Sequence, residues 1–301
     1  MDKDVYVFDL YGTLVDIRTD EDDPGLWRAM AAEYAAECAA YGADELRAAY
    51  DRLVQDEIDV LWARCREELS GRVLLKGEED RGDESNLDCR ENSGECSGLD
   101  CWESFGAGGR LDCREKPGEW DGLDLRHLPR EYVEPSLRRV FERLFEVKGV
   151  AVGPDVVSRI GWRFREISTR KLRLYEGAAE VLAELGRRGH RVYLLSNAQD
   201  VFTRPELEKL GISGAFQGII LSSEVGVKKP ARQIFELLCR RFDVDPARAV
   251  MVGNDPVCDM AAAAEAGMHG VYIHTEQSPA GPVRLPRGCR QIRRIGELTG
   301  E

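Results

Sequence analysis

Segments with a strand pattern alternate with segments with a helical pattern throughout the C-terminal part of the chain. Short apolar runs rich in β-branched residues are typical of buried strands, and longer runs with apolar residues three or four apart are typical of helices. Alternation of this kind predicts a parallel sheet whose two faces are covered by helices. The expected strands are 191–197, 218–222, 249–252 and 271–274, and the expected helices are 176–188, 206–210, 231–242 and 260–266.

A further strand is expected at the start of the chain, over residues 5–9. It ends in a carboxylate, Asp9, and is followed at once by Gly12 and Thr13, which suit a sharp turn. This strand has no partner of its own, so it is expected to join the parallel sheet. Ligands bind at the carboxyl edge of such sheets, and a carboxylate there can attack a substrate covalently. The simpler alternative is that Asp9 only caps the turn after a buried strand.

The long stretch between this strand and the alternating region is mainly helical in pattern. Gly42 interrupts the first helical stretch and is expected to separate two helices. The sequence therefore predicts an α/β core and a helical domain inserted after its first strand. The expected core is 1–16 and 173–301, and the expected insert is 17–172, with helices within 26–69, 134–145 and 154–171.

A 12-residue repeat lies inside the helical domain, at about 77–129. Leu-Asp-Cys begins at Leu87, Leu99 and Leu111, and Leu123-Asp-Leu continues the series. The segment is rich in Gly, Asp, Glu and Ser and too poor in apolar residues to bury a core, so we expect a mobile acidic insertion. The alternative is a metal site, although its cysteines lack the paired spacing of zinc sites. Those cysteines are Cys89, Cys96, Cys101 and Cys113.

The overall composition excludes several kinds of partner. A formal net charge of −13 argues against binding to a nucleic-acid backbone. No apolar run approaches the ~18 residues that span a membrane. The first residues lack the pattern of a signal peptide, and nine cysteines, an odd number, fit a reducing compartment. The sequence thus indicates a cytoplasmic protein that binds neither nucleic acid nor membrane.

Polar residues stand at the ends of the expected strands. Ser196 and Asn197 close one strand, Lys229 precedes a proline, and Asn254 and Asp255 follow the strand 249–252. Each group alone has an ordinary explanation as a helix cap or a turn. Because parallel strands end at one edge of a sheet, these side chains are expected to meet Asp9 there.

Such a cluster could carry out nucleophilic chemistry. Asp9 would attack an electrophile, and hydroxyl groups of Thr13 and Ser196 would donate hydrogen bonds to the transferred group. Lys229 would neutralise Asp9 or an anionic substrate. Asn254 and Asp255 offer the oxygen ligands that Mg²⁺ prefers.

Four motifs appear in order along the chain: Asp9-Leu-Tyr-Gly-Thr-Leu14, Leu195-Ser-Asn197, Lys229-Pro230 and Gly253-Asn-Asp-x-x-x-Asp259. In these motifs the chain resembles the haloacid dehalogenase superfamily of hydrolases. The resemblance implies a Rossmann-like parallel-sheet core with an inserted helical cap, and a small-molecule substrate. It implies that the catalytic residues are Asp9, Thr13, Ser196, Asn197 and Lys229, that Tyr11 and Gly12 contact substrate, and that Mg²⁺ is bound by Asp9, the Tyr11 carbonyl, Asn254, Asp255 and Asp259.

Tyr11 departs from the pattern of the family's phosphatases, which usually carry a second Asp there as general acid and base. Loss of such a group costs on the order of 10²–10⁴ in rate. Tyrosine at this position resembles the L-2-haloacid dehalogenase branch, whereas the acidic fourth motif favours a metal. We expect a Mg²⁺-assisted phosphatase that acts on a small phosphorylated metabolite. The alternatives are a dehalogenase-like hydrolase that acts on a haloacid, and a non-catalytic protein that binds a ligand or partner.

Overall fold

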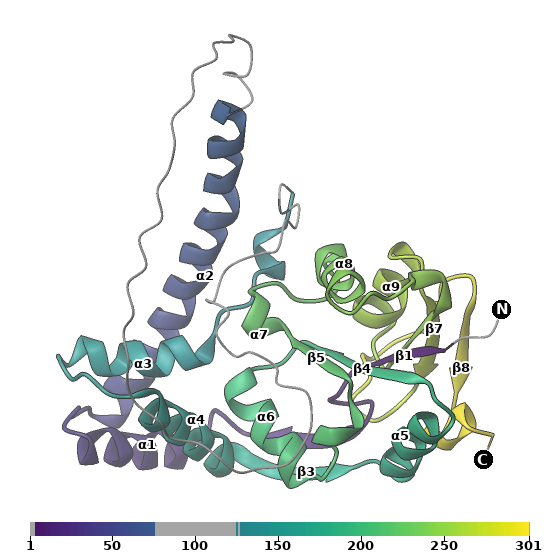
Figure 1. The fold of residues 1–301 in the computed structure, drawn as a ribbon. Coiled ribbons are helices and arrows are strands. Elements are labelled where there is room, and N and C mark those ends of the chain that lie inside the picture. The colour runs from purple at the N-terminus through teal and green to yellow at the C-terminus, as the bar shows by residue number, and fades with distance from the viewer. Residues whose placement is uncertain (1–3, 76–124, 126, 301) are drawn as a thin grey trace, which may run out of the picture.

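The computed structural model describes residues 4–75, 125 and 127–300 and shows a parallel six-stranded sheet joined to a group of helices (Figure 1). The strand order is β5-β4-β1-β6-β7-β8, so the first strand of the chain lies near the middle. This arrangement confirms the α/β core expected from the alternation of strands and helices. The strands are β1 (Val5–Phe8), β4 (Arg191–Ser196), β5 (Gly218–Leu221), β6 (Ala249–Gly253), β7 (His269–Ile273) and β8 (Cys289–Ile292).

The two faces of the sheet are buried by different helices. Alternate side chains of a strand point to opposite faces, so Val5 and Val7 pack in one apolar cluster and Phe8 in another. The first cluster includes residues of α8 (Arg232–Arg241) and α9 (Ala262–Glu265), and the second includes residues of α5 (Ala178–Arg187). Burial on both faces fixes β1 in place and sets Asp9 just beyond its end.

Within the described residues, the inserted cap contains four α-helices, and the expected break at Gly42 lies between the first two. They pack around aromatic side chains that include Tyr50, Phe141 and Phe164. Phe202 of the core helix α6 (Asp200–Lys209) enters the same cluster, with ring centroids 6.0 Å from Phe164 and 6.1 Å from Phe141. Cap and core therefore share one apolar cluster. The cap helices are α1 (Pro24–Ala36), α2 (Ala43–Leu75), α3 (Leu137–Val147) and α4 (Pro154–Ser168).

A two-stranded antiparallel ribbon joins the cap to the core. It pairs β2 (Val15–Thr19) with β3 (Thr169–Leu174). The buried carboxylate of Asp16 accepts hydrogen bonds from Arg173, at 3.0 Å, and forms an ion pair with Lys171. The expected helix through residue 171 was wrong at its end, because α4 stops at Ser168 where the ribbon begins.

The described residues that precede α3 pack against the core. Leu125, Leu128 and Val133 are buried in the apolar cluster that contains Val5 and Val7. The insertion predicted at about 77–129 therefore overlaps the core at its end. The repeat itself and the alternative cysteine site lie at 76–124, outside the described residues.

Several smaller elements differ from the expectations. Helix α6 begins at Asp200, six residues before the expected start, and contains Pro205. The expected helix 260–266 is a π-helical turn, Pro256–Ala261, that continues into α9. The expected last strand is followed by a further one, β8. Unforeseen short helical segments are α7 (Ser222–Val225), Arg130–Tyr132, Ser213–Ala215, Pro246–Arg248 and Ile295–Leu298.

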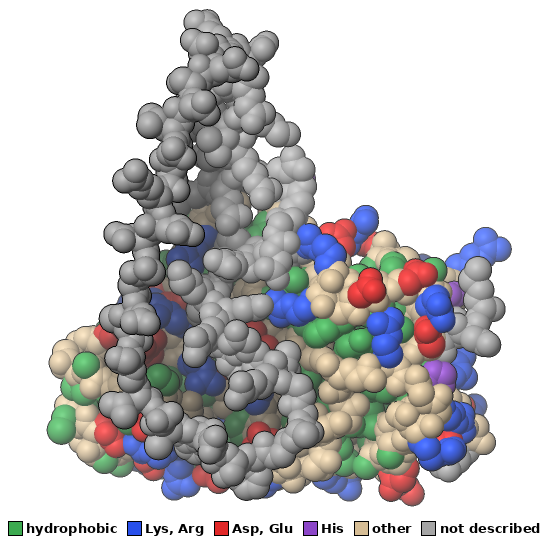
Figure 2. Space-filling model, in the orientation of Figure 1, with side chains coloured by type: hydrophobic (Ala, Val, Ile, Leu, Met, Phe, Trp, Pro, Cys, Tyr) green, Lys and Arg blue, Asp and Glu red, His purple; other side chains and the backbone are tan. Residues whose placement is uncertain are grey.

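The surface of the described residues carries charges of both signs. On the face drawn in Figure 2, basic and acidic side chains lie interspersed over the core helices. Ion pairs such as Arg232 with Glu236, at 2.7 Å, account for part of this mixture. Among the described residues, no helix combines the length and apolar character needed to cross a membrane.

The packing of Leu125 and Leu128 leads to a prediction about shortened chains. A deletion of 77–129 removes both leucines, whereas a deletion of 78–122 spares them. Because loss of a buried leucine side chain costs ~2–5 kcal/mol, the longer deletion should lower the free energy of unfolding by at least ~4 kcal/mol relative to the shorter one. Urea denaturation followed by circular dichroism measures the difference. Equal stability of the two shortened chains would contradict the packing of these leucines in the core.

Candidate active site

Asp9 lies at the carboxyl edge of the sheet with three donors around its carboxylate. Oδ1 accepts hydrogen bonds from Lys229 Nζ, at 2.8 Å, and from Ser196 Oγ, at 3.1 Å. Oδ2 accepts one from Thr13 Oγ1, at 3.2 Å. The structure thus brings together four residues from three of the motifs, as expected. Oδ2 has the fewer contacts, so it is the oxygen best able to react or to bind a cation.

Lys229 is buried between two carboxylates. Its ammonium group donates to Asp9, to Asp259 Oδ1 at 2.7 Å and to the carbonyl oxygen of Leu195 at 3.0 Å, which uses all three protons. Burial by itself lowers the pKa of Lys229, but the charges of Asp259 and Asp9 outweigh this effect and the net shift is upward. Lys229 therefore remains a cation beside the carboxylate of Asp9.

Asp259 acts as the counter-ion of Lys229 rather than as a free carboxylate. Its Oδ2 accepts a hydrogen bond from the backbone N–H of Asp255, at 2.9 Å. Burial raises the pKa of Asp259, and the charge of Lys229 opposes this rise. Gly253 leaves room for this carboxylate, because a Cβ there would lie 2.2 Å from Asp259 Oδ2.

Gly12 allows the first and fourth motifs to approach closely. It has a φ of +82°, and a Cβ at this position would lie 2.3 Å from Asn254 Nδ2. The amide oxygen of Asn254 lies 3.4 Å from the Thr13 hydroxyl, which also contacts Asp9. The Thr13 hydroxyl therefore connects the amide oxygen of Asn254 to Oδ2 of Asp9.

The side chains of Asp255 and Asn197 form hydrogen bonds with backbone groups of the protein. The Asp255 carboxylate accepts hydrogen bonds from the N–H groups of Val257, at 2.7 Å, and Cys258, at 2.8 Å, and so caps the π-helical turn. The Asn197 amide forms hydrogen bonds with both the backbone N–H and the backbone carbonyl of Lys229. Both residues shape the site through the backbone.

The oxygen atoms near Asp9 suit a hard cation. The carboxylate of Asp9 and the amide oxygen of Asn254 both lie beside Thr13, and the Tyr11 carbonyl accepts no hydrogen bond from the described residues. Within the described part of the chain, no three acidic, cysteine or histidine side chains form a metal cluster by themselves. Mg²⁺ commonly binds through one or two carboxylates, water and substrate phosphate, so this donor set fits it.

The phenol of Tyr11 is held in a polar cluster at the junction of α4 and α6. It donates a hydrogen bond to Glu206 and lies 2.9 Å from Thr203 Oγ1. Glu206 also accepts a hydrogen bond of 2.6 Å from Arg165 Nε of the cap, and both charged side chains are buried. Burial raises the pKa of Tyr11, and the negative charge of Glu206 raises it further. Tyr11 therefore stays protonated and ties the catalytic loop to the cap.

These partners of Tyr11 were not found from the sequence. Thr203 and Glu206 are three residues apart on one face of α6. Their spacing could have indicated a polar contact, but the expected helix began only at 206 and excluded Thr203. Arg165 gave no signal of its own among the other arginines of α4.

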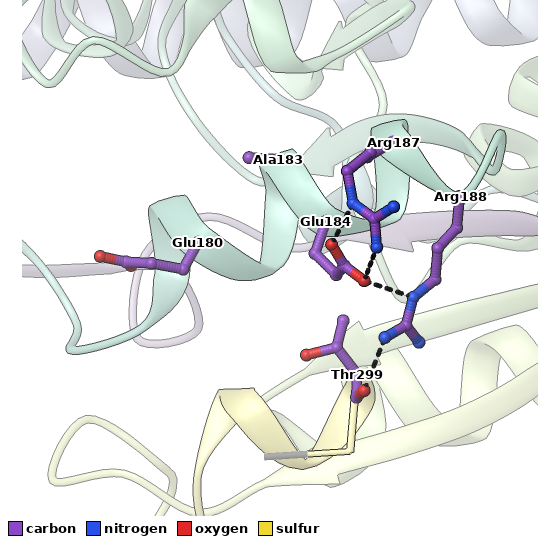
Figure 3. Close-up of a pocket in the computed structure, with 6 residues that line it drawn as sticks. All are labelled: Glu180, Ala183, Glu184, Arg187, Arg188 and Thr299. Carbon is purple, nitrogen blue, oxygen red and sulfur yellow. Dashed lines mark hydrogen bonds and ion pairs between the residues drawn. The ribbon is translucent and has the colours of Figure 1, made fainter.

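Cavities also occur elsewhere in the described residues, and two of them are lined by none of the residues that contact Asp9 or Tyr11. One, of about 400 Å³, lies between α2, α3 and α7 and includes Arg64, Arg139 and Arg143. The other, of about 370 Å³, lies at the end of α5, where Glu184 pairs with Arg187 and Arg188 (Figure 3). Its lining also includes Glu180 and Ala183, and none of the residues that contact Asp9.

Comparison with known proteins agrees with this geometry. The chain belongs to the haloacid dehalogenase-like hydrolases, whose family model matches residues 3–267. It is 33% identical over 153 residues to a phosphoserine phosphatase of Thermus thermophilus, a match that covers 50% of this chain and 60% of that protein. It is 32% identical over 117 residues to a glyceraldehyde 3-phosphate phosphatase of Methanothermobacter thermautotrophicus, covering 39% and 52%. The chain thus spans little more than half the length of these relatives.

A solved structure supports the fold over almost the full length. A 2-haloacid dehalogenase of Pseudomonas syringae pv. Tomato aligns with a TM-score of 0.54 and 18% identity, covering 99% of this chain and 97% of that one. At this identity the likeness extends to the fold alone.

The close approach of Gly12 to Asn254 leads to a second prediction. Gly12→Ala should displace Asn254 and strain the turn, because an alanine disfavours the left-handed φ by about 1 kcal/mol and its Cβ overlaps the amide. We expect most of any hydrolytic activity to be lost with a melting midpoint only a few degrees lower. Gly186→Ala, in a helix with open space at the Cβ position, is the control. Full activity in Gly12→Ala would show that the placement of Asn254 is unimportant.

Proposed function

We propose that the protein hydrolyses phosphate monoesters of small molecules with Asp9 as the nucleophile. The observation that carries this proposal is the set of donors on Asp9. Lys229 and Ser196 hold Oδ1, while Oδ2 has only the weaker contact with Thr13. The named phosphatase relatives support the same reaction.

In the proposed first step, Oδ2 of Asp9 attacks the phosphorus atom of the bound ester. A bond forms between phosphorus and Oδ2, and the bond between phosphorus and the ester oxygen breaks, so the leaving group carries away the electron pair. The hydroxyls of Thr13 and Ser196 and the ammonium of Lys229 stabilise the negative charge on the phosphoryl oxygens. Water then attacks phosphorus. A bond forms between phosphorus and the water oxygen, the bond between phosphorus and Oδ2 breaks, and a water proton passes to the solvent, so phosphate is released and Asp9 is restored as a carboxylate.

Mg²⁺ is the proposed cofactor. Asp9, the Tyr11 carbonyl and Asn254 would hold it, and when bound it would offset the charge of the phosphate. Asp259 would act on this site only through Lys229, and Asp255 through the helical turn that it caps.

The state of Tyr11 limits the esters that this site can cleave. The phenol keeps its proton and already donates it to Glu206, so it is not free to protonate a leaving group. Esters whose leaving groups depart without a proton, such as aryl phosphates, are therefore the favoured substrates. The alternative substrates, 2-haloacids, also have a leaving group that needs no proton. They are therefore assayed beside the phosphate esters.

The proposal is tested by assays with para-nitrophenyl phosphate and with 2-chloropropionate, each with Mg²⁺ or with a chelator. We expect Mg²⁺-dependent release of phosphate and no release of chloride. Asp9→Asn should reduce phosphate release by at least about 10³-fold, because the nucleophile is lost. The matched control is Asp51→Asn, at an exposed position on α2. Chloride release without Mg²⁺ would favour dehalogenation, and neither activity would favour a binding protein.

A second test replaces Tyr11. Tyr11→Asp should raise kcat/KM for ethyl phosphate more than for para-nitrophenyl phosphate, because only the alkyl leaving group needs a proton. The gain for the alkyl ester should approach the scale of general acid catalysis, about 10²-fold, if the new carboxyl reaches the ester oxygen. Tyr11→Phe, which removes only the hydroxyl, is the control. Equal gains on both esters would show that the carboxyl acts through charge rather than as an acid.

A further inference from the structure

The loop after β4 carries two amide side chains that each hold a neighbouring chain. The first is Asn197, whose Oδ1 accepts a hydrogen bond from Lys229 N, at 2.8 Å, and whose Nδ2 donates to Lys229 O, at 2.9 Å. This pair of bonds fixes the backbone from which the Lys229 ammonium reaches Asp9. Asn197 directly follows Ser196, so these bonds connect the loop after β4 to the segment that carries Lys229.

The second amide is Gln199, which binds the entrance to the cap helix α3. Its Nε2 donates to Glu134 Oε1, at 2.7 Å, and to Pro135 O, at 2.9 Å, and its Oε1 accepts from Leu137 N, at 2.8 Å. Leu137 is the first residue of α3, and the preceding Ser136 makes no capping hydrogen bond with its side chain. Gln199 of the core thus provides the N-terminal cap of a cap-domain helix.

The segment held by Gln199 is hydrogen-bonded to residues 226–229, here called the Lys229 loop. Glu134 N donates to Gly226 O, and Lys228 N donates to Tyr132 O, both at 2.9 Å. Val133 and Val227 pair between these bonds and are both fully buried. The loop after β4, the Lys229 loop and the chain that enters α3 therefore form a closed ring of contacts.

The charge of Glu134 depends on this ring. Burial raises the pKa of Glu134, and its counter-charge, Lys228 Nζ, lies 3.4 Å away. The amide of Gln199 is the closer of the two donors. Removal of that donor would leave a desolvated carboxylate one residue from the Val133–Val227 pair, and the Lys229 loop would have to adjust.

We propose that Gln199 is a positioning residue for the reaction, which sets the Lys229 loop through Glu134 and the start of α3. It does not contact Asp9, so it acts only through the backbone of residues 226–229. This inference rests on the proposed roles of Asp9 and Lys229 in phosphate ester hydrolysis. The cap, through α3, would thereby influence how firmly Lys229 is held beside Asp9.

The test compares Gln199→Met, which keeps the side-chain size but removes all three hydrogen bonds, with Gln217→Met at an exposed position. With para-nitrophenyl phosphate and Mg²⁺, Gln199→Met should lower kcat about 10- to 100-fold, the scale of a misplaced catalytic group, and change KM less than about threefold. Gln199→Glu keeps the acceptor for Leu137 N but replaces the donor with a carboxylate oxygen that repels Glu134, so it should lower kcat at least as much as Gln199→Met. If Gln199→Met does not fold, this second variant decides the comparison.

Hydrogen exchange provides a readout that is independent of activity. In Gln199→Met, amides of residues 226–229 and of the first turn of α3 should exchange faster, while those of α5 should not change. Faster exchange at α3 alone, or an unchanged kcat, would overturn the proposal. If the wild-type protein hydrolyses no phosphate ester, the proposed function fails, and exchange in both segments still decides whether Gln199 links them.

Discussion

The ion cluster of Lys229, Asp9 and Asp259 is the interaction on which the site depends. Three charged groups share a region from which water is largely excluded, and such groups are stable only when each has close partners. The cluster satisfies this condition through hydrogen bonds of 2.7 and 2.8 Å on the lysine. With both carboxylates ionised, the cluster has a net charge of −1, which would repel a phosphate group. This excess supports the proposed need for a divalent cation.

Tyr11 connects this ion cluster to the cap. Its backbone lies two residues from Asp9, while its hydroxyl belongs to the buried group formed with Glu206, Thr203 and Arg165. In the phosphatases that the first motif resembles, the same position serves as an acid and base. Here the position serves instead to fasten the catalytic loop to α4 and α6. In the proposed reaction, the departure of the leaving group and the placement of the cap would therefore both depend on Tyr11.

The sequence predicts the strand and helix pattern well wherever one element lies in a uniform environment. The strands ending in Ser196 and Gly253 are buried on both faces, so their apolar runs are unambiguous. The ribbon of β2 and β3 was missed because its residues are mixed in polarity and its pairing joins segments about 150 residues apart. The early start of α6 was missed because Pro205 resembles a helix start.

The gathering of Thr13, Ser196, Lys229 and Asn254 around Asp9 follows from a general rule about parallel sheets. The partners of individual side chains do not follow from it. Asp255 is predicted to be a metal ligand, and its Oδ1 also caps a turn, a use that nothing in the local sequence indicates. The roles of Glu206 and Gln199 depend on contacts with the cap that no short motif encodes.

The chain segment 132–134, which returns from the cap to pair with the Lys229 loop, affects how molecules can enter and leave. A cap connected to the core only through the β2–β3 ribbon could move away from the core as a rigid body. In this chain the cap also contacts the core at two other places. Phe202 of the core packs in the aromatic cluster of the cap, and the segment 132–134 pairs with the loop that carries Lys229. Attachment at several places opposes a large movement of the whole cap. For the proposed reaction, this restraint favours small substrates that reach Asp9 without such a movement.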